Sequence, residues 1–200
     1  MFRVGLTGNV ASGKSAVADV WRRLGAAIVD ADELARDAVR PGSEGLRRVV
    51  QRFGNRVLHE DGSLDRAALR NVVFADAGQR LALERILHPE IARLRKEEEA
   101  RLEQEGVHVV VHMIPLLFEA GLTKEVNTIV LVDAPAHMRL RRIQETRGLN
   151  EEEARRMIDA QMTSDEKRAS ADIVIDNDGT LEQLEARAAD AWRQVLRQAG

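Results

Sequence analysis

The residues with the clearest chemical potential lie near the N-terminus, where the sequence reads Gly8-Asn9-Val10-Ala11-Ser12-Gly13-Lys14-Ser15. This run fits the pattern G-x-x-x-x-G-K-[ST], in which the glycines permit a tight turn that aims backbone N–H groups at phosphate oxygens. A helix that begins there adds the positive end of its dipole. Lys14 can then reach the β- and γ-phosphates, and the Ser15 hydroxyl can bind Mg²⁺. The spacing predicts a site for ATP and Mg²⁺ formed by this P-loop and by Ala16, which follows it.

Two carboxylates form a second candidate cluster, Asp30-Ala31-Asp32, at the end of an apolar run over residues 26–30. Open α/β sheets bind their ligands at the carboxyl ends of the strands. In extended backbone, residues two apart point to the same side, so both carboxylates would face the phosphates. One could accept a proton from an attacking hydroxyl while the other assists Mg²⁺. The alternative is that the pair caps a helix beginning near residue 33.

The sequence lacks the motifs that are typical of other classes of nucleotide-binding protein. The sequence contains no Asn-Lys-x-Asp, and its D-x-x-G match at residues 176–179 follows the last predicted strand, which argues against a GTPase. The run at residues 109–113 supplies no acid of the kind that motor ATPases use for Mg²⁺. A compact kinase with a small acceptor is the class that remains.

The composition narrows the possible partners. The 200 residues are 44% hydrophobic and 32% charged, with a net charge of −3, so a core can form but no basic field exists for nucleic acid or an anionic membrane. There is no Cys, which excludes thiol chemistry. The N-terminal apolar run is too short for a signal peptide, and no later run is long enough to span a membrane. We therefore expect a cytoplasmic protein, a monomer or weak homo-oligomer, that binds small anionic ligands at a local site.

Short apolar runs alternate with helical stretches, which predicts an α/β fold with a five-stranded parallel sheet covered by helices. The expected strands cover residues 2–7, 26–30, 107–113, 127–133 and 171–175. Helices are expected at residues 13–24 and at 180–198, the latter capped by Thr180. A helical insertion should occupy residues 43–53, 65–74 and 76–105, with a break or kink near His88 because Pro89 follows. A second insertion, rich in Arg and Glu, covers residues 137–168.

Several segments together resemble the dephospho-coenzyme A kinase family. They are Gly5-Leu6-Thr7-Gly8, Asp30-Ala31-Asp32, Pro41-Gly42-Ser43, Ile86-Leu87-His88-Pro89, Pro115-Leu116-Leu117-Phe118-Glu119 and Val174-Ile175-Asp176-Asn177. The resemblance implies a three-layer P-loop kinase core over residues 1–40, 106–136 and 169–200. It also implies a helical acceptor-binding insertion over 41–105 and a helical lid over 137–168. The implied reaction is ATP-dependent phosphorylation of the ribose 3′-hydroxyl of dephospho-CoA. A kinase of another small acceptor, or a nucleotide-binding regulator without catalysis, are the alternatives.

The resemblance also implies roles for single residues. Asp32 becomes the base or orienter of the 3′-hydroxyl, and Lys14 and Ser15 serve the phosphates and Mg²⁺. Among the arginines of the second insertion, Arg139, Arg141, Arg142 and Arg147, we expect Arg142 to bind the transferred phosphate, since a guanidinium makes forked hydrogen bonds to phosphate oxygens. The alternative for each is a solvated helix face.

For five further residues, two interpretations stay open. Arg36 contacts substrate or forms a surface ion pair, and His88 lines the acceptor pocket or only shapes the helix. Leu117 and Phe118 form an apolar wall near the acceptor or pack in the core. Asn177 binds the nucleotide or is a turn residue. Two positions depart from the family's pattern: Met113, where an acid is usual, and Met157, where an Arg is common.

Overall fold

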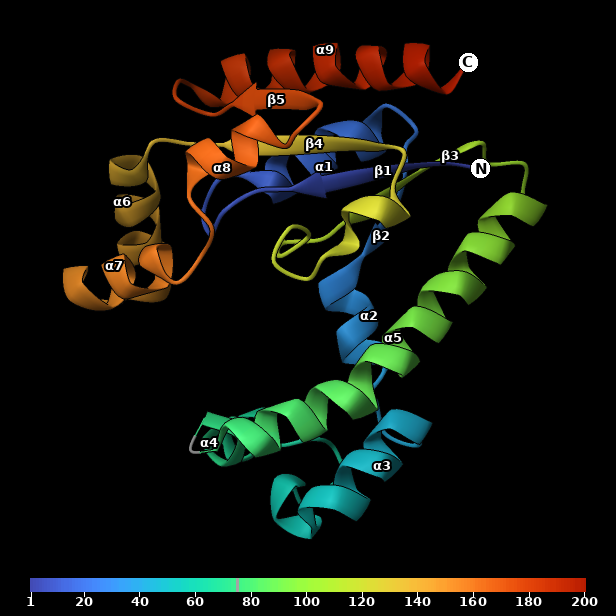
Figure 1. The fold of residues 1–200 in the computed structure, drawn as a ribbon, viewed down its shortest axis with the longest axis vertical. Coiled ribbons are helices and arrows are strands. Elements are labelled where there is room, and N and C mark those ends of the chain that lie inside the picture. The colour runs from blue at the N-terminus through green and yellow to red at the C-terminus, as the bar shows by residue number, and fades with distance from the viewer. Residues whose placement is uncertain (75) are drawn as a thin grey trace. The chain divides into compact units, whose positions relative to one another are not determined.

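The predicted strands form and join in one parallel sheet (Figure 1). They are β1 (Phe2–Thr7), β2 (Ala27–Asp30), β3 (Val109–Met113), β4 (Thr128–Asp133) and β5 (Ile173–Asp176). The computed structural model describes residues 1–74 and 76–200, which divide into one unit of residues 1–30 and 102–200 and another of residues 31–101. The sheet lies in the first unit, with the strand order β2-β3-β1-β4-β5.

Burial on both faces explains the apolar runs that predicted these strands. β1 lies in the middle of the sheet, between β3 and β4. All residues of β4 but the last are buried, as in a parallel sheet covered on both sides. The α/β fold with a five-stranded parallel sheet is confirmed, with strand ends within a few residues of those expected.

Two helices cover one face of the sheet: α1 (Lys14–Arg23) and α9 (Leu181–Ala199). Their apolar faces share one core with the strands, in which the rings of Trp21 and Trp192 lie 5.2 Å apart. The Trp21 Nε1–H donates to the Ala188 carbonyl at 2.8 Å, which satisfies its buried polar atom. Thr180 caps α9 as predicted, since its hydroxyl accepts from the Gln183 N–H at 3.2 Å.

The segment of residues 114–127, which includes the short helix η2 (Leu122–Glu125), packs against the middle strand. A Cβ at Gly5 would lie 2.5 Å from the Leu117 Cδ1 and 3.2 Å from a methyl of Val126. Only glycine permits so close an approach between the strand backbone and these side chains.

The second unit is helical and has its own core. Its elements are α2 (Ala31–Asp37), α3 (Glu44–Phe53), η1 (Asn55–Val57), α4 (Arg66–Phe74) and most of α5 (Ala77–Gln104). Val49, Phe53 and Val57 are among its buried residues. The helices expected in this region are confirmed, and of the break or kink expected near His88 the structure shows no break, because α5 continues through Pro89. Proline removes one backbone hydrogen bond, and the helix changes direction along its length without ending (Figure 1).

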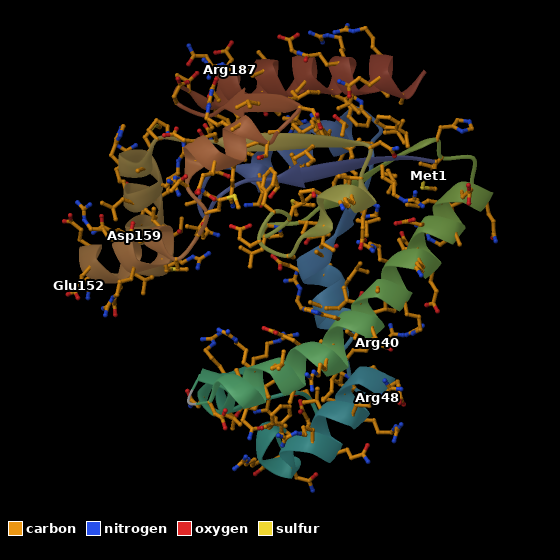
Figure 2. All side chains as sticks on the ribbon, viewed as in Figure 1. Met1, Arg40, Arg48, Glu152, Asp159 and Arg187 are labelled. Atoms are coloured by element: carbon orange, nitrogen blue, oxygen red, sulfur yellow. The ribbon has the colours of Figure 1, made fainter. Side chains whose placement is uncertain are left out.

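Three helices follow β4 and form the Arg- and Glu-rich insertion: α6 (Ala136–Arg147), α7 (Glu151–Asp159) and α8 (Ser164–Ala169). α7 and α8 each begin with a capping box, made by Asn150 with Glu153 and by Thr163 with Glu166. Figure 2 shows Glu152 and Asp159 at opposite ends of α7. In the part of the chain that is described, no helix is both long and apolar enough to cross a membrane.

Candidate functional site

The turn between β1 and α1 needs glycine at both of its ends. A Cβ at Gly8 would lie 2.3 Å from the carbonyl oxygen of Val132, at the end of β4. Gly13 has a φ of +100°, and a Cβ there would lie 2.3 Å from the Asn177 Nδ2. Close packing against the ends of β4 and β5 therefore reinforces the glycine spacing that the turn itself requires.

Lys14 and the start of α1 present positive charge to this turn. The Lys14 ammonium donates to the carbonyl oxygen of Gly8 at 2.7 Å and to that of Asn9 at 3.4 Å. No side chain of the described residues caps α1, and its first turn carries no acidic residue. The N–H groups and the dipole at this helix end thus favour an anion, and Ser15 beside them is exposed.

A side chain directly after β5 and another from α6 hold the Ala11–Ser12 side of the P-loop. Asn177, only 5% exposed, donates through its Nδ2 to the carbonyl oxygen of Ser12 at 2.7 Å. The Arg142 guanidinium donates to the carbonyl oxygen of Ala11 at 3.2 Å and to the Asn177 Oδ1 at 3.3 Å. The structure thus brings together three predicted components: the P-loop, Arg142 and Asn177.

The Asn9–Val10 side is held by residues 160–163, which connect α7 to α8 and are called the strap below. The Val10 N–H donates to the Gln161 Oε1 at 2.8 Å, and the Asn9 Nδ2 donates to the carbonyl oxygen of Met162 at 3.3 Å. Sequence reasoning did not single out Gln161 or Met162. The signal was present, however: Thr163 followed by Glu166 is a capping-box pattern, and it places a connection directly before the helix it begins.

The other arginines of α6 lie apart from the P-loop. Arg139 is 4% exposed and donates through its Nε to the carbonyl oxygen of Ala134 at 3.1 Å, and burial lowers its pKa. The Arg141 side chain is 69% exposed, and its Nε lies 3.6 Å from the Glu145 Oε1. This position agrees with the alternative of a solvated helix face. Arg147 donates to the sulfur of Met157 at 3.7 Å. Of these arginines, Arg142 is the one that contacts the P-loop.

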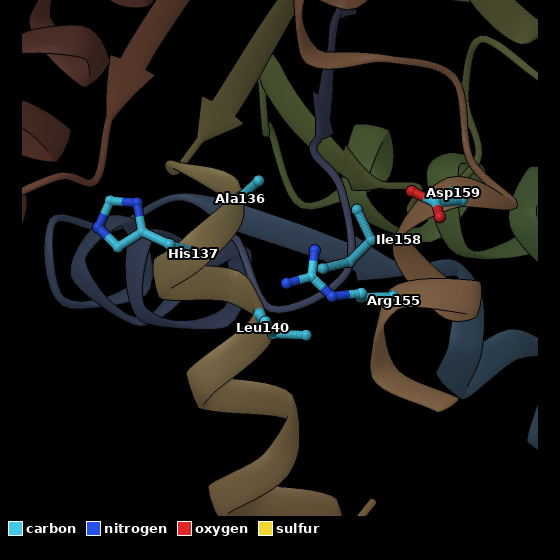
Figure 3. A pocket seen from close by; sticks show the side chains of 6 residues that line it. All are labelled: Ala136, His137, Leu140, Arg155, Ile158 and Asp159. Atoms are coloured by element: carbon cyan, nitrogen blue, oxygen red, sulfur yellow. The ribbon is translucent and has the colours of Figure 1, made fainter. Parts of the chain in front are cut away.

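A pocket of about 390 Å³ lies beside the Asn9–Val10 side. Its lining comes from the P-loop, the start of α6 and the strap, and includes Asn9, Ala134, Arg139, Gln161, Met162 and Thr163. A smaller pocket of about 170 Å³ separates α6 from α7 (Figure 3). There Arg155 reaches from α7 toward α6, whereas His137 points away. The larger pocket adjoins the P-loop and is the candidate space for nucleotide groups.

The two carboxylates after the second strand do not share one extended segment. Asp30 is the last residue of β2, but α2 begins at Ala31, and Asp32 lies exposed in its first turn. The expectation that both point to one side of an extended strand is therefore wrong, because the chain becomes helical after Asp30. The position of Asp32 agrees more closely with the helix-start alternative, in which an acid favours the N-terminal end of a helix.

The candidate acceptor residues fall into two groups. Leu117 is buried beneath the sheet and packs against Gly5, in agreement with the core-packing alternative, and Phe118 beside it is half-buried. Arg36 on α2 and His88 on α5 are exposed in the helical unit. Met113, at the end of β3, is buried in the main core.

Comparison with known proteins identifies the family. A family model described as dephospho-CoA kinase matches residues 2–183. Proteins named dephospho-CoA kinase from Thermobifida fusca and Syntrophotalea carbinolica are 42% and 49% identical, over 98% and 92% of this chain and 98% and 87% of their own lengths. The crystal structure of TT1252 from Thermus thermophilus is 40% identical over 96% of both chains, with a TM-score of 0.85. A dephospho-CoA kinase structure from Campylobacter jejuni, 24% identical over 99% of this chain and 98% of its own, shares the fold with a TM-score of 0.75. The chain belongs to the dephospho-CoA kinase family.

Proposed function

We propose that the protein transfers the γ-phosphoryl group of ATP to the ribose 3′-hydroxyl of dephospho-CoA, giving CoA and ADP. The observation that carries the proposal is the P-loop with Arg142 and Asn177 hydrogen-bonded to its backbone, in a chain of this family. The 3′ oxygen forms a bond to the γ-phosphorus as the bond to the β,γ-bridging oxygen breaks. The hydroxyl proton passes to Asp32 or to water, and ADP departs with the electron pair of the broken bond.

Charge stabilisation is the main task in this chemistry, because the phosphoryl group passes through a loose transition state. The residues assigned to ATP are the P-loop residues 8–15, Ala16, Arg142 and Asn177. The turn and the α1 N-terminus bind the phosphates, Lys14 neutralises the β- and γ-phosphates, and Arg142 stabilises charge as it develops. Members of kinase families use ATP with a divalent metal, and Mg²⁺ is the ion proposed here.

The donor set suits Mg²⁺ bound mainly to the nucleotide. The exposed Ser15 hydroxyl would hold the ion, which keeps several waters and phosphate oxygens as its other ligands. Within residues 1–74 and 76–200 no three His, Asp or Glu side chains gather into a group that could hold a metal ion. When bound, the ion supplies positive charge against the phosphate oxygens.

The acceptor residues follow from the family pattern. Asp32 orients the 3′-hydroxyl or accepts its proton, and Arg36, His88, Leu117 and Phe118 bind dephospho-CoA. Residues 41–105 would then form the acceptor-binding insertion and residues 137–168 the lid, while Asp32, Arg36 and His88 all lie in the compact unit of residues 31–101. The proposal also includes a cytoplasmic location and a monomer or weak homo-oligomer. It includes no nucleic-acid or membrane partner.

The test is a coupled assay of ADP formation with the purified chain, ATP and dephospho-CoA, with and without Mg²⁺. We expect ADP and CoA only when all are present. A protein that phosphorylates other small alcohols but not dephospho-CoA would contradict the acceptor, and tight ATP binding without any transfer would favour a regulator.

Asp32→Asn tests the acceptor role separately. It removes the carboxylate while keeping the side-chain volume, so turnover should fall strongly with ATP affinity nearly unchanged. Near-normal turnover would remove Asp32 from the mechanism.

A further inference from the structure

An ion pair with one fully buried partner joins α8 to the segment of residues 114–127, and the proposed function does not use it. Lys167 in α8 has a fully buried side chain, and its ammonium lies 2.8 Å from the Glu119 Oε1. The Glu119 side chain is 25% exposed. Taking charges out of water is costly, and apolar residues of similar volume often serve stability equally well. A buried pair of this kind therefore suggests a role in fixing geometry.

Glu119 also holds the strap directly. The Met162 N–H donates to the same Oε1 at 3.2 Å. Burial alone would raise the pKa of Glu119, but the adjacent Lys167 ammonium and backbone N–H groups outweigh it and hold the pKa below its usual value. The carboxylate is therefore ionised at neutral pH, so its hydrogen bond from the Met162 N–H is charge-assisted.

The strap, which Glu119 holds through the Met162 N–H, also contacts the P-loop. On its other side, the Met162 carbonyl accepts from the Asn9 side chain, and the neighbouring Gln161 accepts from the Val10 N–H. A continuous set of contacts thus runs from Lys167 through Glu119 and the strap to the Asn9–Val10 side.

Other contacts hold α8 in place without this pair. Arg168 donates to Asp133 at 2.9 Å and to Asp176 at 2.6 Å, and the Ser164 hydroxyl donates to Asp133 at 2.8 Å. These bonds join α8 to the ends of β4 and β5. The distinctive contact of Glu119 is the one to the Met162 backbone, which lines the pocket beside the P-loop.

We propose that Glu119 and Lys167 are positioning residues for ATP: through the strap they fix the Asn9–Val10 side of the P-loop in the geometry that binds the nucleotide. This inference rests on the proposed function for its biological meaning, but it can be tested by MgATP binding alone.

Two double variants separate the strap contact from the charges. Glu119→Leu with Lys167→Met removes the ion pair and the acceptor for the Met162 N–H. Glu119→Gln with Lys167→Met also removes the ion pair but keeps an amide oxygen as acceptor. We expect the first to weaken MgATP binding about tenfold, the size of one lost hydrogen bond to a charged group, and the second to stay within about threefold of the parent.

Calorimetric titration of the full chain with MgATP gives the dissociation constants, and a thermal melt reports folding. Equal MgATP affinity in the two double variants, whether high or low, would overturn the proposal, because the strap contact would then make no difference. Arg23→Met is the matched control: it breaks the exposed ion pair with Glu185, 2.6 Å between α1 and α9, and should leave MgATP affinity unchanged.

The single variant Lys167→Met provides a second test in case the double variant Glu119→Leu with Lys167→Met does not fold. It leaves Glu119 without its cation, so MgATP affinity should fall about threefold or more. Parent-like affinity with a lowered melting temperature would show a purely structural pair and overturn the proposal. The assay with dephospho-CoA on the parent is run separately, so failure of the acceptor assignment is distinguishable from failure of the positioning role.

Discussion

Neighbouring elements hold the two sides of the P-loop in different ways, one side through hydrogen-bond donors and the other through acceptors. On the Ala11–Ser12 side, Arg142 and Asn177 donate to carbonyl oxygens of the turn. On the Asn9–Val10 side, the strap accepts from an N–H and from a side-chain amide. The contacts described from other elements are therefore donors on one side and acceptors on the other, whereas Lys14, within the loop itself, donates to the carbonyls of Gly8 and Asn9.

This difference has a consequence for anion binding. Donors on the carbonyls do not compete with phosphate for the N–H groups of the turn, and Arg142 adds a positive charge beside them. An acceptor on the Val10 N–H uses one N–H group to hold the shape of the loop. Loss of the Arg142 charge should therefore affect the rate of transfer most, and changes on the Asn9–Val10 side should mainly affect ATP affinity.

The largest effect is expected from Arg142→Ala. It removes the guanidinium from the P-loop, and kcat should fall about a hundredfold, within the range for one well-placed electrostatic donor, with a smaller change in KM for ATP. Steady-state kinetics measures both. The matched control is Arg141→Ala on the same helix, whose exposed side chain lies near Glu145 and whose loss should leave both constants unchanged. An unchanged kcat in Arg142→Ala would return that residue to the solvated face.

Asn177→Asp separates the donor from the acceptor on the same side. The substitution replaces the Nδ2 donor by an oxygen facing the Ser12 carbonyl, but an oxygen remains to accept from Arg142. We expect MgATP binding to weaken about tenfold, and the free energy of unfolding to fall by about 2 kcal/mol, the cost of a buried group left without its partner. Titration and thermal melts measure the two effects. Parent-like stability would mean that the Ser12 carbonyl does not depend on this donor.

Gln161→Leu tests the opposite side and should have a smaller effect. It removes the acceptor for the Val10 N–H, while the bond from Asn9 to Met162 remains. We expect KM for ATP to rise about threefold with kcat nearly unchanged, since one net hydrogen bond is worth about 1 kcal/mol. A fall in kcat as large as that in Arg142→Ala would remove the distinction between the two sides.

Local patterns predicted the P-loop and most of the fold because their causes are local. Glycine spacing sets the turn, and a Thr three residues before a Gln caps α9. The position of Asp32 was misjudged, since pairing of Asp30 with Met113 decides where β2 ends and the helix begins. Strand ends depend on such tertiary pairing, which a single strand's sequence does not contain.

Two further features, the contact of Gln161 with the P-loop and the continuous course of α5, depend on contacts that are distant in sequence or on packing. Gln161 meets Val10 across 151 positions of sequence, and no spacing rule connects them. α5 continues through Pro89 although proline disfavours a helix interior, and half-buried residues on both sides of it, Ile86 and Ile91 among them, help to hold the helix. Packing thus decided between the two outcomes that proline allows, a break or a bend, and kept the helix continuous, whereas in the P-loop local sequence and packing agree.

The smallest effect on the site is expected from Trp21→Phe, at the far end of the helix that begins with Lys14. The change removes the Nε1–H that donates to the Ala188 carbonyl and part of the contact with Trp192, so the free energy of unfolding should fall by about 1 kcal/mol, or roughly 2–4 °C in melting temperature. MgATP affinity should stay within about twofold of the parent, because neither side of the P-loop contacts this end of α1. Thermal melts and titration measure the two quantities. A loss of affinity as large as that of Gln161→Leu would mean that the seating of α1 on the sheet, rather than the contacts on the two sides of the loop, sets the geometry of the P-loop.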